Sequence, residues 1–149
     1  MKYHIQEGTF SVGNRSWLDN SLNILRNDQD GISIVISRGP IPEDCDFEQA
    51  FNQQWSTLRE QMGRVKQSAF ERISAGPLRQ IRAIEVVSEF EHHGQYLFQR
   101  QLAVQVPDTA VLLVITYSSQ HGLSEQELQQ WDELKSTLIL NPTDRTPEP

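Results

Sequence analysis

The stretch YLFQRQLAVQV, residues 96–106, alternates between two kinds of side chain along its whole length. Successive side chains of a β-strand point to opposite faces, so one face carries Tyr96, Phe98, Arg100, Leu102, Val104 and Val106. The other face carries Leu97, Gln99, Gln101, Ala103 and Gln105. We therefore predict a strand with one core face and a second face of neutral amides spaced by small or apolar groups.

Similar alternating or apolar runs occur on both sides of this strand. They predict further strands at residues 3–6, 10–12, 21–26, 31–38, 65–74, 78–91 and 110–119. The NDQDG sequence between two of these runs has the composition of a turn, with Gly31 supplying a positive φ. It predicts an antiparallel hairpin of residues 21–26 and 31–38.

Two segments have residues that typically begin and end a helix. Residues 47–62 follow an N-cap at Asp46, have Glu48 in the first turn and precede Gly63, which predicts a helix over that range. A second helix is predicted from Ser124, in a capping box with Glu127, to about Leu134. The element order predicts an α+β fold, an antiparallel sheet packed with helices. We expect one domain over residues 1–142 and a disordered polar tail at residues 143–149.

Composition excludes several classes of partner. The chain of 149 residues has a net charge of −7, with Lys and Arg scattered singly, so we expect no nucleic-acid or anionic-membrane surface. The N-terminus lacks the apolar region of a secretory or lipoprotein signal, which predicts a cytoplasmic protein. The longest apolar run, at residues 110–115, is far shorter than the roughly 20 residues of a spanning helix, so no membrane insertion is expected.

The candidates for catalysis are weak. Cys45 follows two acidic residues, which raise rather than lower a thiol pKa, and as the single cysteine it forms no internal disulfide. His92 and His93 lie in a predicted turn without a third ligand at a diagnostic spacing. Nucleophile-elbow, phosphate-loop and dinucleotide motifs are absent from the sequence. We expect no enzyme, no metal site and no cofactor.

The first predicted helix has an apolar stripe that contains one amide. The stripe, at helical spacing, consists of Phe47, Ala50, Phe51, Trp55, Leu58 and Met62, and Gln54 falls inside it. Gln54 either reaches solvent from the edge of the stripe or is an amide placed on an apolar surface. A buried amide has to be hydrogen-bonded or it costs about 1–3 kcal/mol.

The predicted strand at residues 21–26 also allows two interpretations. Alternation places Leu22 and Ile24 on one face. They are either core residues or the lining of an exposed apolar groove, which on a small protein normally marks a binding site.

An ordered set of sequence features resembles the Eag-type chaperones of bacterial type VI secretion. These belong to the DcrB-like group, whose fold is similar to that of Mog1. The features are SLNIL after a region containing Trp17, VISR at residues 35–38, QQW at residues 53–55, LFQRQLAV, and the segment at residues 131–142. The resemblance covers nearly all of residues 1–142, and no single motif in it is highly specific.

This resemblance implies a homodimer that binds the N-terminal transmembrane helices of an effector, often an Rhs protein with a PAAR domain, before export. The groove residues of the family fall on Leu22, Ile24, Gln54 and Gln101, with Leu at position 22 where Ile is usual. Gln99, Ala103 and Gln105 are candidates for further groove lining. An envelope-anchored DcrB relative would carry a lipoprotein signal, and this chain departs from that pattern.

The row of glutamines then has a physical explanation. Neutral amides can hydrogen-bond to small polar groups on many different helices without a counter-charge, whereas a charged row would impose a desolvation penalty. Two rival hypotheses are a carrier of small hydrophobic ligands, which needs a closed pocket, and a hydrolase, which needs a nucleophile and a carboxylate converging on His92 or His93.

Overall fold

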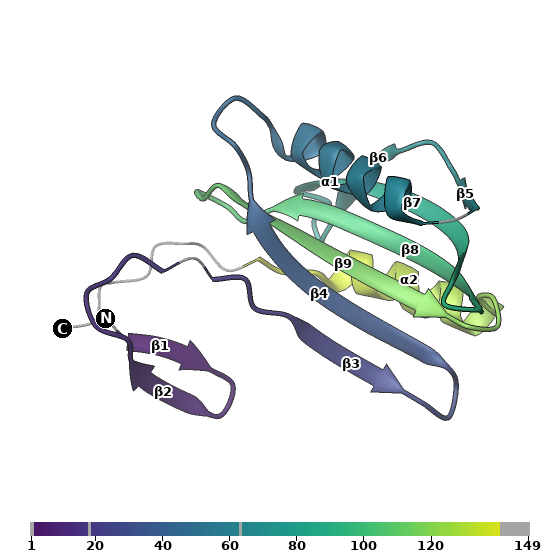
Figure 1. Cartoon of the computed structure of the whole chain (residues 1–149), viewed down its shortest axis with the longest axis horizontal. Coiled ribbons are helices and arrows are strands. Elements are labelled where there is room, and N and C mark those ends of the chain that lie inside the picture. The colour runs from purple at the N-terminus through teal and green to yellow at the C-terminus, as the bar shows by residue number, and fades with distance from the viewer. Residues whose placement is uncertain (1, 18, 63, 141–149) are drawn as a thin grey trace.

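The computed structural model describes residues 2–17, 19–62 and 64–140, and in this part of the chain it confirms the α+β class. Its main feature is a seven-stranded antiparallel sheet in the order β3-β4-β9-β8-β7-β5, with β6 also paired to β7 (Figure 1). The strands are β3 (Asn23–Asn27), β4 (Ile32–Pro40), β5 (Val65–Gln67), β6 (Glu71–Ala75), β7 (Ile81–His92), β8 (Gln95–Gln105) and β9 (Val111–Ser119). The predicted tail at residues 143–149 lies outside the described residues.

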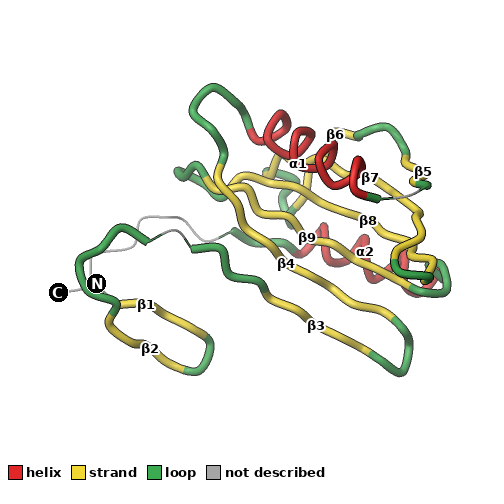
Figure 2. The backbone as a smooth tube through the Cα atoms, in the orientation of Figure 1, coloured by secondary structure: helices red, strands yellow, loops and turns green. Residues whose placement is uncertain are grey.

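Helices α1 (Phe47–Gln61) and α2 (Glu125–Thr137) pack on opposite faces of this sheet (Figure 2). The core below α1 is formed by the strand side chains that point to the α1 face of the sheet, among them Ile84, Val86, Ala103 and Val114. The core below α2 is formed by the alternate strand side chains, which point to the opposite face, among them Ala83, Leu102, Val104 and Ile115. The central strands β7, β8 and β9 are therefore covered on both faces.

Local chemistry explains why α1 begins and packs where it does. The side chain of Asp46 accepts a hydrogen bond from the backbone of Gln49, whose own side chain accepts one from the backbone of Asp46, which forms a capping box. Phe47, Ala50, Phe51 and Trp55 are buried along the predicted stripe. Leu58 is 39% exposed, so the stripe leaves the core at the last turns. The predicted stop, Gly63, lies outside the described residues.

The capping box of Ser124 and Glu127 is present at the start of α2, as predicted, and the helix runs three residues beyond Leu134. Trp131 is fully buried, and its Nε1 donates to Oε2 of Glu85 on β7 at 2.6 Å. Lys135 Nζ donates to the same oxygen at 2.7 Å. This three-residue contact fixes α2 to the centre of the sheet.

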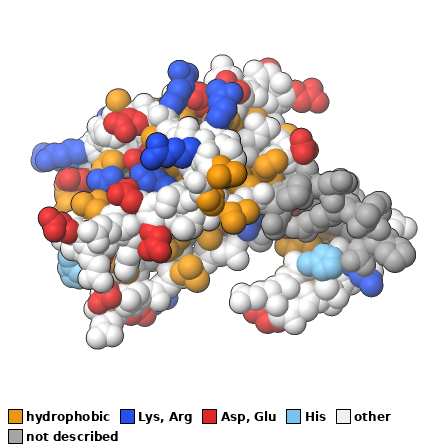
Figure 3. Space-filling model, turned by 180° about the vertical axis from the view of Figure 1, so that it is seen from behind, with side chains coloured by type: hydrophobic (Ala, Val, Ile, Leu, Met, Phe, Trp, Pro, Cys, Tyr) orange, Lys and Arg blue, Asp and Glu red, His pale blue; other side chains and the backbone are white. Residues whose placement is uncertain are grey.

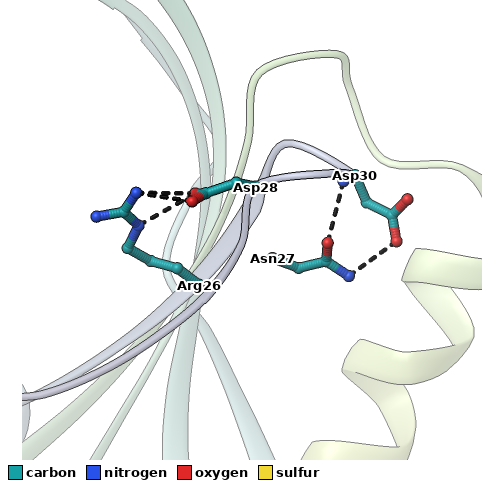
Figure 4. Close-up of polar contacts among 4 residues, drawn as sticks. All are labelled: Arg26, Asn27, Asp28 and Asp30. Carbon is teal, nitrogen blue, oxygen red and sulfur yellow. Dashed lines mark hydrogen bonds and ion pairs between the residues drawn. The ribbon is translucent and has the colours of Figure 1, made fainter.

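The turn between β3 and β4 has the predicted hairpin form. Gly31 has a φ of +67°, and Arg26 forms a bidentate contact with Asp28 (Figure 4). Asn27 Oδ1 accepts from the backbone N–H of Asp30 at 3.1 Å, while its Nδ2 donates to the carboxylate of Asp30 at 2.9 Å. These contacts fix the hairpin register, in which Ile24 is opposite Val35.

The prediction of one strand over residues 65–74 is wrong. The segment forms two strands, β5 and β6, which pair with opposite ends of β7. Ser68 still bonds to Val87 through its backbone and its hydroxyl, and the chain then leaves the sheet. This break lets Phe70 pack edge-on against Phe51 of α1, with 5.8 Å between the ring centroids.

The predicted division of residues 96–106 into a core face and a second face is correct for Leu102 and Val104, which are fully buried. It is wrong for Tyr96, which is 43% exposed because the end of the β7–β8 hairpin extends past the core, and whose hydroxyl donates to Glu89. The second face also differs from the prediction, because α1 covers its middle and buries Gln101 and Ala103.

The first two strands, β1 (Lys2–Ile5) and β2 (Gly8–Ser11), form a separate two-stranded sheet. This hairpin stands apart from the main sheet and is joined to β3 by a long connection (Figure 1). Its strands correspond to the predicted segments 3–6 and 10–12, each beginning somewhat earlier than expected.

Candidate functional site on the open sheet face

The sheet register brings the residues proposed from the resemblance to one face. Ile24 pairs with Val35, Val35 with Thr116, Thr116 with Gln101, and Gln101 with Val86, forming one cross-strand row on the α1 side. Side chains alternate between the two faces of a strand, so Leu22, two residues before Ile24, is expected on the same side, although it precedes the first residue of β3. Gln99, Ala103 and Gln105 share this side as alternate residues of β8.

Helix α1 covers only part of this side. Its buried residues contact β7, β8 and β9, whereas β3 and β4 extend beyond it (Figure 1). We call the uncovered α1 side of β3 and β4, with the neighbouring residue of β9, the open face; it consists of Leu22, Ile24, Arg26, Ser33, Val35, Ser37 and Thr116. The open face is thus bordered on one side by α1 and on the other by the edge of the sheet.

The two aliphatic residues on β3 and just before it are exposed. Leu22 is 58% exposed and Ile24 is 56% exposed, which answers the question left open by the sequence in favour of a surface position. Val35, Ser37 and Thr116 are half-buried beside them. The open face therefore joins large apolar side chains to short hydroxyl groups.

The open face carries little charge. The cross-strand row on one side of Ile24 consists of the paired residues Arg26, Ser33, Ser118, Gln99 and Ser88. Arg26 is its one cation, and the guanidinium is paired with Asp28 at 2.9 Å. On the other side of Ile24, Ser37, Val114, Ala103 and Ile84 form an uncharged row. An apolar segment placed across this surface would meet no unpaired charge in these rows.

Two glutamines of β8 are bonded to hydroxyl groups of β9. Gln99 Nε2 donates to Ser118 Oγ at 3.0 Å, and Gln101 Nε2 donates to Thr116 Oγ1 at 3.1 Å. Gln101 is only 8% exposed, and its Oε1 is buried without a hydrogen-bond partner. Ser88 Oγ, on the same side of the sheet, is also buried without a partner. Such groups are uncommon in native proteins and call for an explanation.

Gln54 is exposed on α1, which favours the interpretation that its side chain reaches solvent. It lines a hollow of about 300 Å³ between α1 and the ends of β4 and β9. Gln53 and Thr57 line the helix side of this hollow, and Gly39 and Leu112 line the sheet side. Gln54 therefore lies on the side of α1 that faces β4.

The remaining candidates do not reach the open face. Ala103 is fully buried below α1, in contact with the cluster of Ala50 and Phe51, so no ligand touches it in this conformation. Gln105 lies at the end of β8, where its Nε2 donates to the carbonyl of Thr109 at 2.6 Å. Val35, Ser37 and Thr116 were missed because only the pairing of β3, β4 and β9 places them beside Ile24.

The groups considered for catalysis remain apart from this site. Desolvation and the neighbouring Asp44 carboxylate raise the pKa of the Cys45 thiol, so it is a poor nucleophile. His92 and His93 are exposed in the β7–β8 turn, with 3.9 Å between their ring centroids. Among the described residues, no group of three His, Cys, Asp or Glu side chains has a geometry that would hold a metal ion.

Neither helix in the described part of the chain has the length and apolar character needed to cross a membrane.

Comparison with known proteins agrees with this fold. A crystal structure of PA94 from Pseudomonas aeruginosa, described as a protein of unknown function and a candidate regulator, superposes with a TM-score of 0.72 at 21% sequence identity. The match covers 96% of this chain and 98% of that one. No curated protein matches the sequence. The family model named DcrB matches residues 7–137. The chain therefore belongs to the DcrB family.

Proposed function

We propose that this protein is a binding chaperone without catalytic activity. Its cargo is the N-terminal hydrophobic region of a PAAR-containing Rhs-type effector of type VI secretion, as the resemblance to Eag-type chaperones implies. It acts in the cytoplasm as a homodimer, shielding the transmembrane helices of the effector until the effector is loaded onto the secretion spike.

The observation that carries this proposal is the exposure of Leu22 and Ile24 on a face with no unpaired charge in its rows. A transmembrane helix exposes about 20 apolar residues in water, and burying each one fully is worth roughly 1.5–3 kcal/mol. The exposed Leu22 and Ile24, on the side of the sheet that carries α1, give such a helix an apolar surface to pack against. Neighbouring exposed apolar side chains on one face of a small protein mark a candidate interaction site.

The polar groups of the same face support a helix as the cargo. Hydroxyl and amide groups bond to small polar side chains on a transmembrane helix, and they require no counter-charge. The Oε1 atom of Gln101 is a buried acceptor without a partner, next to the half-buried Thr116. A cargo hydroxyl that reached this oxygen after a small outward movement of α1 would satisfy it.

No specific observation favours the alternative, a carrier of small hydrophobic ligands. That function needs an enclosed apolar cavity, and the hollow beside Gln54 is open to solvent. The description of PA94 as a candidate regulator names no ligand and no residue, so it supports no second candidate function for this chain. The charge of −7 and the paired state of Arg26 are unsuited to a nucleic-acid surface.

Co-expression tests the proposal directly. The N-terminal hydrophobic segment of a PAAR-containing Rhs effector, fused to a soluble carrier protein, is expressed with and without the chaperone. We expect the segment to stay soluble and to co-purify only with the chaperone. A fusion that carries an unrelated 20-residue Leu/Ala helix measures selectivity. Equal behaviour of the effector segment with and without the chaperone would overturn the proposal.

A further inference from the structure

The edge of the main sheet opposite to β3 is formed by two short strands. β5 and β6 both pair with β7, one near each end of it, and neither pairs with a further strand on its outer side. In the described part of the chain, no backbone hydrogen bond reaches the outer side of Glu71–Ala75. The N–H and C=O groups of β6 that point away from β7 are therefore open to pairing with another chain.

Two hollows lie beside β6, one on each face of the sheet. The hollow on the α1 face has a volume of about 230 Å³ and is lined by the first turn of α1 together with Arg72 and Arg82. The hollow on the α2 face has a volume of about 680 Å³ and is lined by the last turns of α2 together with Arg79. Ile73 and Ser74 of β6 line both hollows. The side chains of an added strand would point alternately to the two faces, and so into the two hollows in turn.

Each hollow contains one arginine that has no partner. In the hollow on the α1 face, Arg72 Nε donates to Glu48 Oε1 at 2.7 Å, whereas the side chain of Arg82 forms no ion pair or hydrogen bond among the described residues. In the hollow on the α2 face, Lys135 pairs with two carboxylates, at 2.7 and 3.3 Å. The side chain of Arg79 has no such contact with any described residue. Both unpaired arginines are exposed and can reach a ligand.

We propose that β6 binds an extended acidic segment of a partner protein, which adds to the sheet as an outer strand. Two adjacent acidic residues of that segment point to opposite faces, so one carboxylate meets Arg82 and the other meets Arg79. The outer backbone groups of β6 supply the main-chain hydrogen bonds, and the two hollows select the side chains. This surface goes beyond the proposed capture of hydrophobic segments, because β6 and the open face lie at opposite edges of the sheet.

Charge favours an acidic peptide as the occupant. Residues 64–82 contain five Lys and Arg residues and one acidic residue, although the whole chain carries a net charge of −7. The helices place Glu48 and Asp132 beside this edge, and in the view from behind Lys and Arg side chains gather in the upper part of the molecule with acidic ones among them (Figure 3). A continuous polyanion would meet these carboxylates, whereas a peptide places its acidic groups only at Arg79 and Arg82.

A peptide titration followed by NMR tests this surface. The probe is acetyl-TVTDEVT-amide, whose adjacent acidic residues can face both arginines, and the control peptide is acetyl-TVTNQVT-amide. Added to the ¹⁵N-labelled full chain, the acidic peptide should shift the backbone amide signals of Glu71–Ala75 and slow the hydrogen exchange of the outer amides. The neutral peptide should bind about tenfold more weakly, because it forms no charge-assisted hydrogen bonds with the arginines.

Substitution of the two arginines measures their contribution. Arg79→Gln combined with Arg82→Gln should weaken binding of the acidic peptide about tenfold and leave binding of the neutral peptide unchanged. Arg64→Gln combined with Lys66→Gln is the matched control, because it removes the same charge from the β5 end of this edge, outside both hollows. This control should bind the acidic peptide like the wild type. All four side chains are exposed, and circular dichroism checks that both variants are folded.

Equal affinity of the acidic and neutral peptides overturns the proposal, and so does equal affinity of the wild type and the Arg79→Gln, Arg82→Gln variant for the acidic peptide. Vesicles of phosphatidylglycerol and phosphatidylcholine and a short DNA duplex are the other probes. Binding of either probe that the arginine variant loses, without binding of the acidic peptide, would assign the edge to a polyanion and also overturn the proposal. None of these measurements involves the hydrophobic segment, so their failure leaves the proposed chaperone function standing.

Discussion

Ile24 and Gln101 lie in the same cross-strand row of the sheet, with Val35 and Thr116 between them. Three strand spacings separate them, about 14 Å. Exposure falls along this row, from 56% at Ile24 to 8% at Gln101. The row therefore runs from an open apolar edge to a buried amide below α1, and its two ends can be tested separately.

Replacing both Leu22 and Ile24 by Asp should abolish capture of the effector segment and leave the fold intact. A carboxylate that faces an apolar helix loses its hydration without gaining a partner. Both residues are more than half exposed, so the folded protein tolerates the change. Co-purification with the effector segment measures capture, and circular dichroism and thermal melting measure the fold.

Leu78→Asp is the control for this double variant, since Leu78 is 84% exposed and lies in the turn before β7, away from the open face. It should bind the segment like the wild type. Normal capture by a folded variant with Asp at positions 22 and 24 would show that the binding site lies elsewhere, even though the family assignment would stand.

Gln101 should show opposite effects on binding and on stability. Gln101→Leu combined with Thr116→Val removes the unpartnered Oε1 and both members of the hydrogen bond, so unfolding free energy should be unchanged or higher. Binding of the segment should weaken by about 0.5–1.5 kcal/mol because one hydrogen bond is lost. Urea unfolding and a binding titration measure the two quantities.

Two single substitutions complete the set. Gln101→Ala should also weaken binding, but it leaves the hydroxyl of Thr116 without its donor and so lowers stability. Gln101→Glu should be worse than either for binding, because it places a charge at a site that is only 8% exposed. Unchanged affinity in all three variants would remove Gln101 from the site.

The sequence alone predicted most elements, because alternation and capping boxes are local signals. Ser124 with Glu127 and the turn at Gly31 needed no knowledge of the rest of the chain. The break after Ser68 was missed because its cause, the packing of Phe70 on Phe51, involves residues far apart in sequence.

The site was predicted only in part, because it too depends on contacts between residues far apart in sequence. The register across β3, β4, β9 and β8 brings Ile24 and Gln101 into one row, and the position of α1 decides that Ala103 is covered.

Glu85 should be essential for the packing of α2. Glu85→Ala leaves the indole of the buried Trp131 without its acceptor and leaves Lys135 only its contact with the exposed Asp132 at 3.3 Å. Removing one partner of a buried charged pair typically costs about 3–5 kcal/mol. Thermal and urea unfolding should report a loss of this order.

Arg72→Ala is the control for this variant. Arg72 pairs with Glu48, but its side chain is 83% exposed, so removing it should change the stability only slightly. Equal losses in both variants would mean that the contact of Glu85 does not anchor the helix.

The carboxylate of Asp19 makes the stability of the N-terminal segment, residues 2–17 and 19–22, depend on pH. Partial burial acts to raise the pKa of Asp19, but hydrogen bonds from Ser21 and Tyr3 outweigh it and hold the pKa below its ordinary value of 3.8. Because the pKa is lower in the folded N-terminal segment, the ionised form stabilises this segment above pH 3.8, and this contribution is lost as the pH falls through the lowered pKa.

Tyr3→Phe removes one of these hydrogen bonds and should move the pKa of Asp19 upward, toward its ordinary value. An NMR titration of the Asp19 carboxyl measures the shift, and Tyr96→Phe is the control, because its hydroxyl bonds to Glu89 at the far end of the β7–β8 hairpin. The same pKa in Tyr3→Phe and in the wild type would show that Tyr3 does not contact Asp19 in solution, so that this bond does not join β1 to the connection before β3.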